Sequence, residues 1–182
     1  MLGNRELVTI SKFMSYVLRH DPAAIGLDVD ANGWADIEQL IDRANARGRR
    51  LSRETVDEVV ERNDKKRFVV SEDGRRIRAA QGHSMNVDLQ LEPREPREVL
   101  HHGTVRQAVE SIRARRLSSR SRNHVHLSTD EQTARKVGQR HGNPVVLRIR
   151  AGDMWAAGHK FYLSENGVWL TDAVPPEFID TS

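Results

Sequence analysis

The chain has 182 residues, of which 37% are hydrophobic and 30% charged, and its formal net charge is +3. This length allows one medium domain or two small ones with a packed core. Cysteine is absent, which excludes disulfides, thiol nucleophiles and cysteine-ligated zinc. No apolar run reaches the roughly 20 residues of a membrane helix, and the first residues lack a signal-peptide core. We therefore expect a cytoplasmic protein.

Arginine supplies most of the basic residues. Its planar guanidinium binds phosphate through two parallel hydrogen bonds and stays charged at any working pH. An arginine-rich, mildly basic chain therefore suits an anionic partner. The alternative is an ordinary solvated surface, and charge alone favours that alternative.

Apolar residues at helical spacing predict three helices in the first half of the chain. The first ends near Arg19 and His20, before Asp21-Pro22. The second follows Gly33-Trp34-Ala35-Asp36 and stops before Gly48, and Ser52 caps the third. Two β-prone runs, 67–70 and 76–79, then flank Asp73-Gly74 and predict a hairpin. Three helices followed by a hairpin is the order of a winged-helix module.

Residues 86–98 are charged and contain two prolines, which predicts a linker between modules 1–85 and 99–182. In the second module we expect a strand over 99–102, a turn at Gly103 and Thr104, and a helix around 108–112. We further expect a strand over 124–127, a capping box at 128–131 that opens a helix through Val137, and a strand over 145–149. Residues 161–163 and 168–170 predict a second hairpin. The fold class is therefore α+β.

Four groups of basic residues each allow a structural and a functional interpretation. Arg19 and His20 suit either the capping of a helix C-terminus or phosphate binding, and the residues alone favour capping. Arg67, Arg76 and Arg78 fit a charged edge strand and a nucleic-acid-contacting wing about equally. The run Arg113, Arg115, Arg116, Arg120 and Arg122 leans toward a phosphate-binding surface because so few acidic residues accompany it. The histidines at 83, 101, 102, 124 and 126 invite a metal site, but no metal-ligand spacing supports one.

Standard nucleotide-binding signatures are absent, because the sequence holds neither a G-x-G-x-x-G fingerprint nor a Walker A motif. Several blocks nevertheless resemble the tRNA (RNA) 2′-phosphotransferase family, in order along almost the whole chain. They are S-K-F-M-S-Y-V-L-R-H at 11–20, G-W at 33–34, R-F at 67–68, I-R-A-A-Q-G-H-S at 77–84, H-G-T at 102–104, R-N-H-V-H-L-S at 122–128 and S-E-N-G-V-W-L-T at 164–171. The chain departs from the family at His101, where tyrosine is common, and at Ala80, where asparagine is common.

This resemblance implies a winged-helix-like N-terminal lobe and an ADP-ribosyltransferase-like lobe that binds NAD⁺. It also implies a two-step reaction that needs no metal. The RNA 2′-phosphate displaces nicotinamide from NAD⁺, giving an ADP-ribosylated RNA 2′-phosphate. The ribose 2″-hydroxyl then attacks phosphorus, which leaves RNA with a free 2′-OH and ADP-ribose 1″,2″-cyclic phosphate.

The resemblance also assigns site residues. The catalytic set is Arg19, His20, Arg67 and Arg122, with the arginines on the 2′-phosphate and His20 in proton transfer or phosphate contact. The positions that match NAD⁺ contacts are His102, Gly103, Thr104, His126, Leu127, Ser128, Asn166, Gly167 and Val168. Lys12, Arg78, Gln81 and His83 are expected to contact the RNA.

The expected partner is an RNA with a 2′-phosphate, such as a tRNA splicing intermediate, and the protein is expected to be a monomer. Three alternatives stay open. The first is an ADP-ribosyltransferase that stops after the first step on a nucleic-acid phosphate. The second is a winged-helix nucleic-acid binder without enzymatic activity, and the third is a metal-dependent phosphatase.

Overall fold

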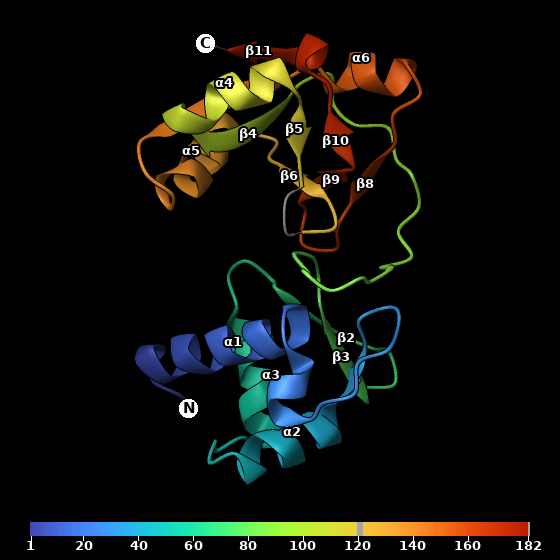
Figure 1. Cartoon of the computed structure of the whole chain (residues 1–182). Helices are drawn as coiled ribbons and strands as arrows, with labels where there is room; N and C mark the ends of the chain where they lie inside the picture. Colours follow the sequence, from blue (N-terminus) through green and yellow to red (C-terminus); the bar gives the residue numbers. More distant parts are fainter. Residues whose placement is uncertain (120–121, 182) are drawn as a thin grey trace. The chain divides into compact units, whose positions relative to one another are not determined.

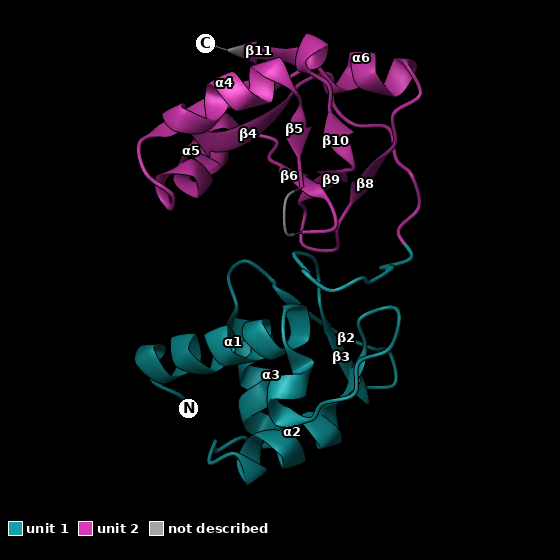
Figure 2. Ribbon diagram, in the orientation of Figure 1, with its two compact units in different colours: residues 1–90 teal, residues 91–182 magenta. Residues whose placement is uncertain are grey.

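The computed structural model describes residues 1–119 and 122–181 (Figure 1). It divides the chain into two compact units, Met1–Gln90 and Leu91–Ser182, shown in teal and magenta in Figure 2. Both units combine helices with small antiparallel sheets, which confirms the α+β class. Within the described residues, no helix has the length and apolar character needed to cross a membrane.

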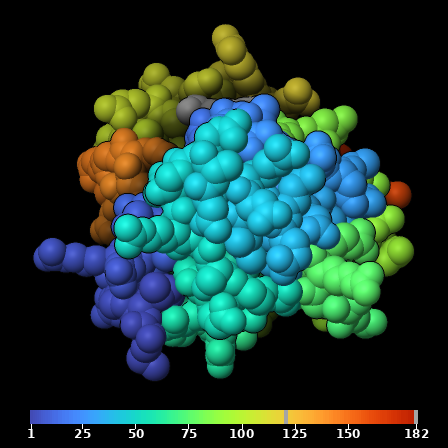
Figure 3. Space-filling view, turned by 90° about the horizontal axis from the view of Figure 1, so that it is seen from below, coloured from blue at the N-terminus to red at the C-terminus, as the bar shows by residue number. Residues whose placement is uncertain are grey.

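Unit 1 contains the three predicted helices and a short 3₁₀ turn. These are α1 (Asn4–Arg19), η1 (Pro22–Ile25), α2 (Ile37–Ala46) and α3 (Arg53–Arg62). The Asp36 side chain caps α2 by accepting from the Gln39 amide, and Ser52 caps α3 by accepting from the Thr55 amide. Gly48 has a φ of +83° just beyond α2, as expected for a glycine that ends a helix. Figure 3 shows α2 and α3, in light blue to teal, forming much of one face of this unit.

The predicted hairpin of unit 1 is confirmed. Strands β1 (Ala35–Asp36), β2 (Phe68–Val70) and β3 (Arg76–Ala79) form an antiparallel sheet in the order β1-β3-β2. Gly74 adopts a φ of +71° in the turn between β2 and β3. The helices and this sheet bury one apolar core that includes Met14, Leu18, Ile37 and Ile77.

Unit 2 is built on two three-stranded antiparallel sheets and a two-stranded ribbon. The first sheet has the order β11-β7-β4, from Ile179–Thr181, Pro144–Ile149 and Leu100–Val105. The second has the order β6-β9-β8, from Val125–Leu127, Trp169–Thr171 and Phe161–Leu163. The ribbon pairs β10 (Ala173–Val174) with β5 (Leu117–Ser118). Its helices are α4 (Arg106–Ala114), α5 (Glu131–Gln139), α6 (Ala151–Ala156) and η2 (Pro176–Phe178).

The turn predicted at Gly103 and Thr104 is wrong, because β4 continues through both residues to Val105. Gly103 is instead a packing residue under α5. A Cβ atom at Gly103 would lie 1.6 Å from the Ala134 carbonyl oxygen, and one at Gly138 would lie 2.8 Å from the Thr104 carbonyl oxygen. Strand and helix therefore meet backbone to backbone through two glycines.

The capping box predicted at 128–131 is also wrong. Helix α5 begins at Glu131, and the Asp130 carboxylate caps it by accepting from the Thr133 amide at 2.7 Å. These hydrogen bonds lower the pKa of Asp130. Ser128 cannot cap the helix because it pairs with His101, each residue donating its amide to the other's carbonyl at 2.8 Å.

Candidate active site

The first group of predicted residues lies where α1 ends. The Ser84 amide donates to the Arg19 carbonyl at 3.0 Å, and a 2.9 Å hydrogen bond joins Nδ1 of His20 to the Ser84 hydroxyl. Gly82, with a φ of +88°, lies against the Arg19 side chain, so that a Cβ there would be 3.6 Å from Cζ. Segment 81–84, which includes the half-buried Gln81, is therefore folded onto the end of α1 beside Arg19 and His20.

Arg67 is connected to α1 through Asn63, a residue that sequence reasoning did not identify. The Asn63 side chain donates to the buried Ser11 hydroxyl at 3.0 Å and accepts from the Arg67 amide at 3.3 Å. The Arg67 carbonyl in turn accepts from the Ala80 amide at 2.8 Å. Lys12 is exposed on α1, next to Ser11. A continuous series of hydrogen bonds therefore connects the 11–20, 67–68 and 77–84 blocks.

His83 is the most deeply buried titratable group of this region, with 2% of its surface exposed. Burial lowers its pKa to about 4, and the charges of Arg19, Arg78 and His20 contribute in the same direction. Its Nε2 atom has no hydrogen-bond partner among the described residues. A Cβ at Gly33 would lie 3.3 Å from that nitrogen, and Gly33 has a φ of +86°. Glycine is thus required where the 30–34 loop passes over the imidazole.

This burial predicts that His83 makes stability depend on pH. The unfolded chain binds a proton at His83 near pH 6.5 and the folded chain only near pH 4, so stability falls as the pH drops between these values. We expect up to about 3 kcal/mol to be lost from this group. Urea unfolding at neutral pH and near pH 4 measures the loss, and His83→Leu should show a smaller pH dependence. Equal dependence in both proteins would contradict the assignment.

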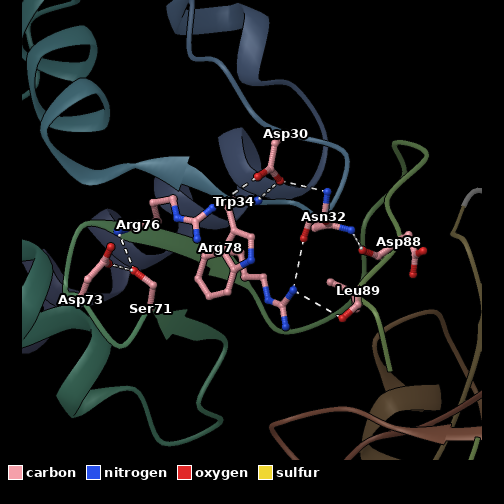
Figure 4. Close-up of polar contacts among 9 residues, drawn as sticks. All are labelled: Asp30, Asn32, Trp34, Ser71, Asp73, Arg76, Arg78, Asp88 and Leu89. Carbon is pink, nitrogen blue, oxygen red and sulfur yellow. Dashed lines mark hydrogen bonds and ion pairs between the residues drawn. The ribbon is translucent and has the colours of Figure 1, made fainter. Parts of the chain in front are cut away.

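Arg78 and Arg76 of β3 both contact Trp34, as Figure 4 shows. Arg78 is buried, its guanidinium carbon is 4.4 Å from the ring centroid, and its Nη1 donates to the carbonyls of Asn32 at 3.3 Å and Leu89 at 3.4 Å. Arg76 is exposed and pairs with Asp30 at 3.6 Å. The two arginines share one face of β3, as the strand period predicts, and Arg78 holds two loops in place.

In unit 2, two of the blocks predicted to contact NAD⁺ lie side by side. The backbone pairing of His101 with Ser128 joins β4 to the residue after β6. Nδ1 of His102 lies 3.0 Å from the His126 carbonyl. A carbonyl only accepts, so neutral His102 carries its proton on Nδ1 and leaves Nε2 as an acceptor. The 102–104 and 126–128 blocks are thereby held together.

The third predicted block, Asn166, Gly167 and Val168, forms the turn between β8 and β9. The buried Ser164 hydroxyl accepts from the Val168 amide at 3.0 Å and donates to the Asn166 side chain. Gly167 adopts a φ of +84°. Trp169 pairs with both Leu163 and Leu127, which places this turn at the end of the sheet where β6 finishes. The end of β6 and the 164–168 turn therefore lie at one end of sheet β6-β9-β8, with His101 and His102 beside β6.

Arg122 reaches His126 from the segment before β6. Its Nη1 lies 2.9 Å from His126 Nδ1. Because a guanidinium only donates, His126 accepts on Nδ1 and is neutral with its proton on Nε2. Desolvation and the charge of Arg140 lower the pKa of Arg122. Arg19, His20 and Arg67 belong to unit 1 and Arg122 to unit 2, and Arg120 lies outside the described residues.

Nowhere in residues 1–119 and 122–181 are three His, Asp or Glu side chains grouped so as to hold a metal ion. His124 lies with its ring 5.7 Å from that of Tyr162 and its Nε2 3.8 Å from Asp172. Burial lowers the pKa of His124, and Asp172 opposes that shift.

Comparison with known proteins identifies the class of this chain. It is 58% identical over 179 residues to a probable RNA 2′-phosphotransferase of Pseudomonas fluorescens, with 98% of each chain covered. It is 56% identical over 172 residues to one of Flavobacterium johnsoniae, with 94% of each covered, and 54% identical over 180 residues to one of Rhodopirellula baltica, with 98% of each covered. These relatives place the chain among transferases that act on RNA.

Residues 5–173 match the model of the family described as RNA 2′-phosphotransferase, Tpt1 / KptA family. The chain belongs to this family, which confirms the resemblance seen in its sequence blocks.

Proposed function

We propose that the protein removes an internal 2′-phosphate from RNA by transferring it to NAD⁺, which it consumes as a co-substrate. A phosphate oxygen forms a bond to C1″ of NAD⁺ as the bond to nicotinamide breaks. The ribose 2″-oxygen then forms a bond to phosphorus as the RNA 2′-oxygen leaves with a proton. The products are RNA with a 2′-OH, nicotinamide and ADP-ribose 1″,2″-cyclic phosphate.

The observation that carries this proposal is that three blocks, 102–104, 126–128 and 166–168, are joined around β6: His101 and His102 contact the 126–128 block, whose end lies beside the 164–168 turn. None of their nine residues carries a negative charge. His102, His126 and Arg122 supply fixed donors and acceptors there. This composition suits an anionic dinucleotide. The packing of α5, which fills the space where a Cβ of Gly103 would lie, by itself requires a glycine at this position.

The positively charged residues of the proposed catalytic set would position the RNA phosphate and stabilise the transition state. A phosphate dianion is already nucleophilic, so the first step needs positioning rather than a general base. The second step gathers negative charge around phosphorus, which arginine forks stabilise. We assign Arg19, Arg67 and Arg122 to these roles. The Ser84 hydroxyl holds Nδ1 of His20 at 2.9 Å, and we assign His20 to the proton that moves from the 2″-hydroxyl to the RNA 2′-oxygen.

We further propose that unit 1 is a winged-helix-like RNA-binding lobe. Its three helices followed by the β2-β3 hairpin support this. Lys12 and Gln81 would contact the RNA, whereas Arg78 and His83 are buried and would support that surface from within. We propose that unit 2 is the ADP-ribosyltransferase-like, NAD-binding lobe. The protein would act in the cytoplasm as a monomer, on RNA such as a tRNA splicing intermediate.

The test is incubation of the pure protein with a short RNA that carries one internal 2′-phosphate, with and without NAD⁺, in the presence of EDTA. We expect phosphate loss only with NAD⁺, together with the cyclic phosphate product, detected by chromatography and mass. RNA that gains ADP-ribose and reacts no further would instead identify a nucleic-acid ADP-ribosyltransferase. RNA binding without any reaction would identify a binding module, and phosphate loss that EDTA abolishes would identify a metal-dependent phosphatase.

A further inference from the structure

Unit 2 has a groove that the proposed reaction does not use. Its volume is about 480 Å³, and it lies between the end of α4, the turn before β8 and the end of β9. The lining residues that matter to its chemistry are Arg115, Arg116, His159, Lys160, Asp172 and Pro175.

The groove lies at the opposite end of β9 from the turn 164–168. Thr171, which lines the groove, is the last residue of β9 and pairs with Val125, the first residue of β6. The Thr171 hydroxyl donates to the Lys160 carbonyl at 2.9 Å and so fixes one wall. Arg122 lies in the segment that leads into β6, so the groove is at the end of the sheet where the Arg122 segment enters.

The side chains that line the groove are mostly positively charged. Arg115, Arg116 and Lys160 are exposed, and within the described residues none of them has a carboxylate within ion-pair distance. The one lining carboxylate, Asp172, lies 3.8 Å from Nε2 of His124. Three cations that face one carboxylate attract a polyanion.

The walls also offer flat and apolar surface. The His159 ring packs edge-on against Phe178, with centroids 5.6 Å apart. Pro175 and Pro176 line the same groove. Single-stranded nucleic acids are bound by grooves that combine basic side chains along the backbone with rings and apolar surfaces against the bases.

We propose that this groove binds the sugar–phosphate backbone of single-stranded RNA that flanks the 2′-phosphorylated nucleotide. This inference rests on the proposed function for the identity of the RNA, but the groove's affinity for RNA is measurable without turnover. It extends the substrate contacts beyond the reacting phosphate, and it makes the enzyme prefer a longer strand to a minimal one.

The test compares Arg115→Ala/Arg116→Ala and Lys160→Ala with wild type in fluorescence-anisotropy titrations of a single-stranded RNA at several salt concentrations. We expect the double variant to bind roughly tenfold more weakly, with the slope of log K against log salt reduced by about 1.4, or about 0.7 for each lost phosphate contact. Lys160→Ala should lose about half of that slope change. For a 2′-phosphorylated trinucleotide, KM should change less than for the longer strand, because a short strand offers the groove fewer flanking phosphates.

A matched control is Arg106→Ala/Arg135→Ala, which removes two exposed arginines of unit 2 from outside the groove. Equal weakening by this control would overturn the proposal, because the effect would then come from net charge. A raised KM for NAD⁺ with unchanged RNA binding would also overturn it and assign the groove to the dinucleotide. If wild type fails to transfer phosphate while the groove variants still weaken RNA binding, the proposed function fails and the groove assignment stands.

Discussion

Replacing Arg122 by alanine should lower kcat for loss of the RNA 2′-phosphate by about 10³-fold, the scale seen when an arginine that neutralises a phosphoryl transition state is removed. Arg122 is held against His126, the middle residue of β6, by a 2.9 Å hydrogen bond. The Arg122 guanidinium group is therefore positioned before the substrate binds. Arg122→Lys keeps the charge but loses the two parallel donors, and we expect it to remain about 10²-fold below wild type.

Single-turnover assays with saturating NAD⁺ and RNA measure this effect, and they separate the two steps when nicotinamide and the cyclic phosphate are followed together. Arg135→Ala is the matched control, because Arg135 is an exposed arginine of unit 2 whose ion pair with Glu131 spans 3.9 Å. It should retain wild-type activity. A rate for Arg122→Ala within about threefold of wild type would show that Arg122 makes no contact specific to the transition state.

Gly103→Ala should unfold unit 2 or destabilise it by more than about 4 kcal/mol, the range of severe backbone and packing defects. The added methyl would lie 1.6 Å from the carbonyl oxygen and 2.6 Å from the carbonyl carbon of Ala134. Both are backbone atoms inside α5, so the clash is relieved only if the whole helix moves off β4. A side chain could rotate away, but a helix backbone cannot.

Denaturant unfolding followed by tryptophan fluorescence measures this loss, since Trp155 and Trp169 report on unit 2 and Trp34 on unit 1. Gly3→Ala is the control, because its new methyl would meet only a Glu6 carboxylate oxygen at 3.9 Å. The control should unfold as wild type does. If Gly103→Ala had wild-type stability, the contact between β4 and α5 would have to be looser than the structure describes.

The sequence predicted those elements whose signals are local. Ser52 and Asp36 begin helices, and Gly48 and Gly74 adopt the positive φ values expected of them, because each acts on residues a few positions away. Gly103 was misassigned to a turn because its glycine requirement comes from Ala134, in a different element. The run 128–131 offers several capping side chains, and only the pairing of Ser128 with His101 shows why Asp130 takes that role.

The same distinction holds for the candidate site. Blocks at 11–20, 77–84 and 102–104 could be identified from their residues and a family resemblance. The Asn63 bridge could not be predicted, because an asparagine after a helix usually needs no further explanation. The groove of unit 2 was also not predicted from the sequence. Arg115 and Arg116 belong to a basic run noted in the sequence, but Lys160 and Asp172 join them only through the fold.

The reciprocal glycine contact has a mechanical consequence. Since the backbones of β4 and α5 touch at Gly103 and Gly138, neither element can slide or roll along the other without a collision of main-chain atoms. His102 on the strand and the Asp130 cap of the helix therefore belong to one stiff frame. At the proposed NAD⁺ site, such a frame would hold the His102 imidazole in one orientation before the dinucleotide binds.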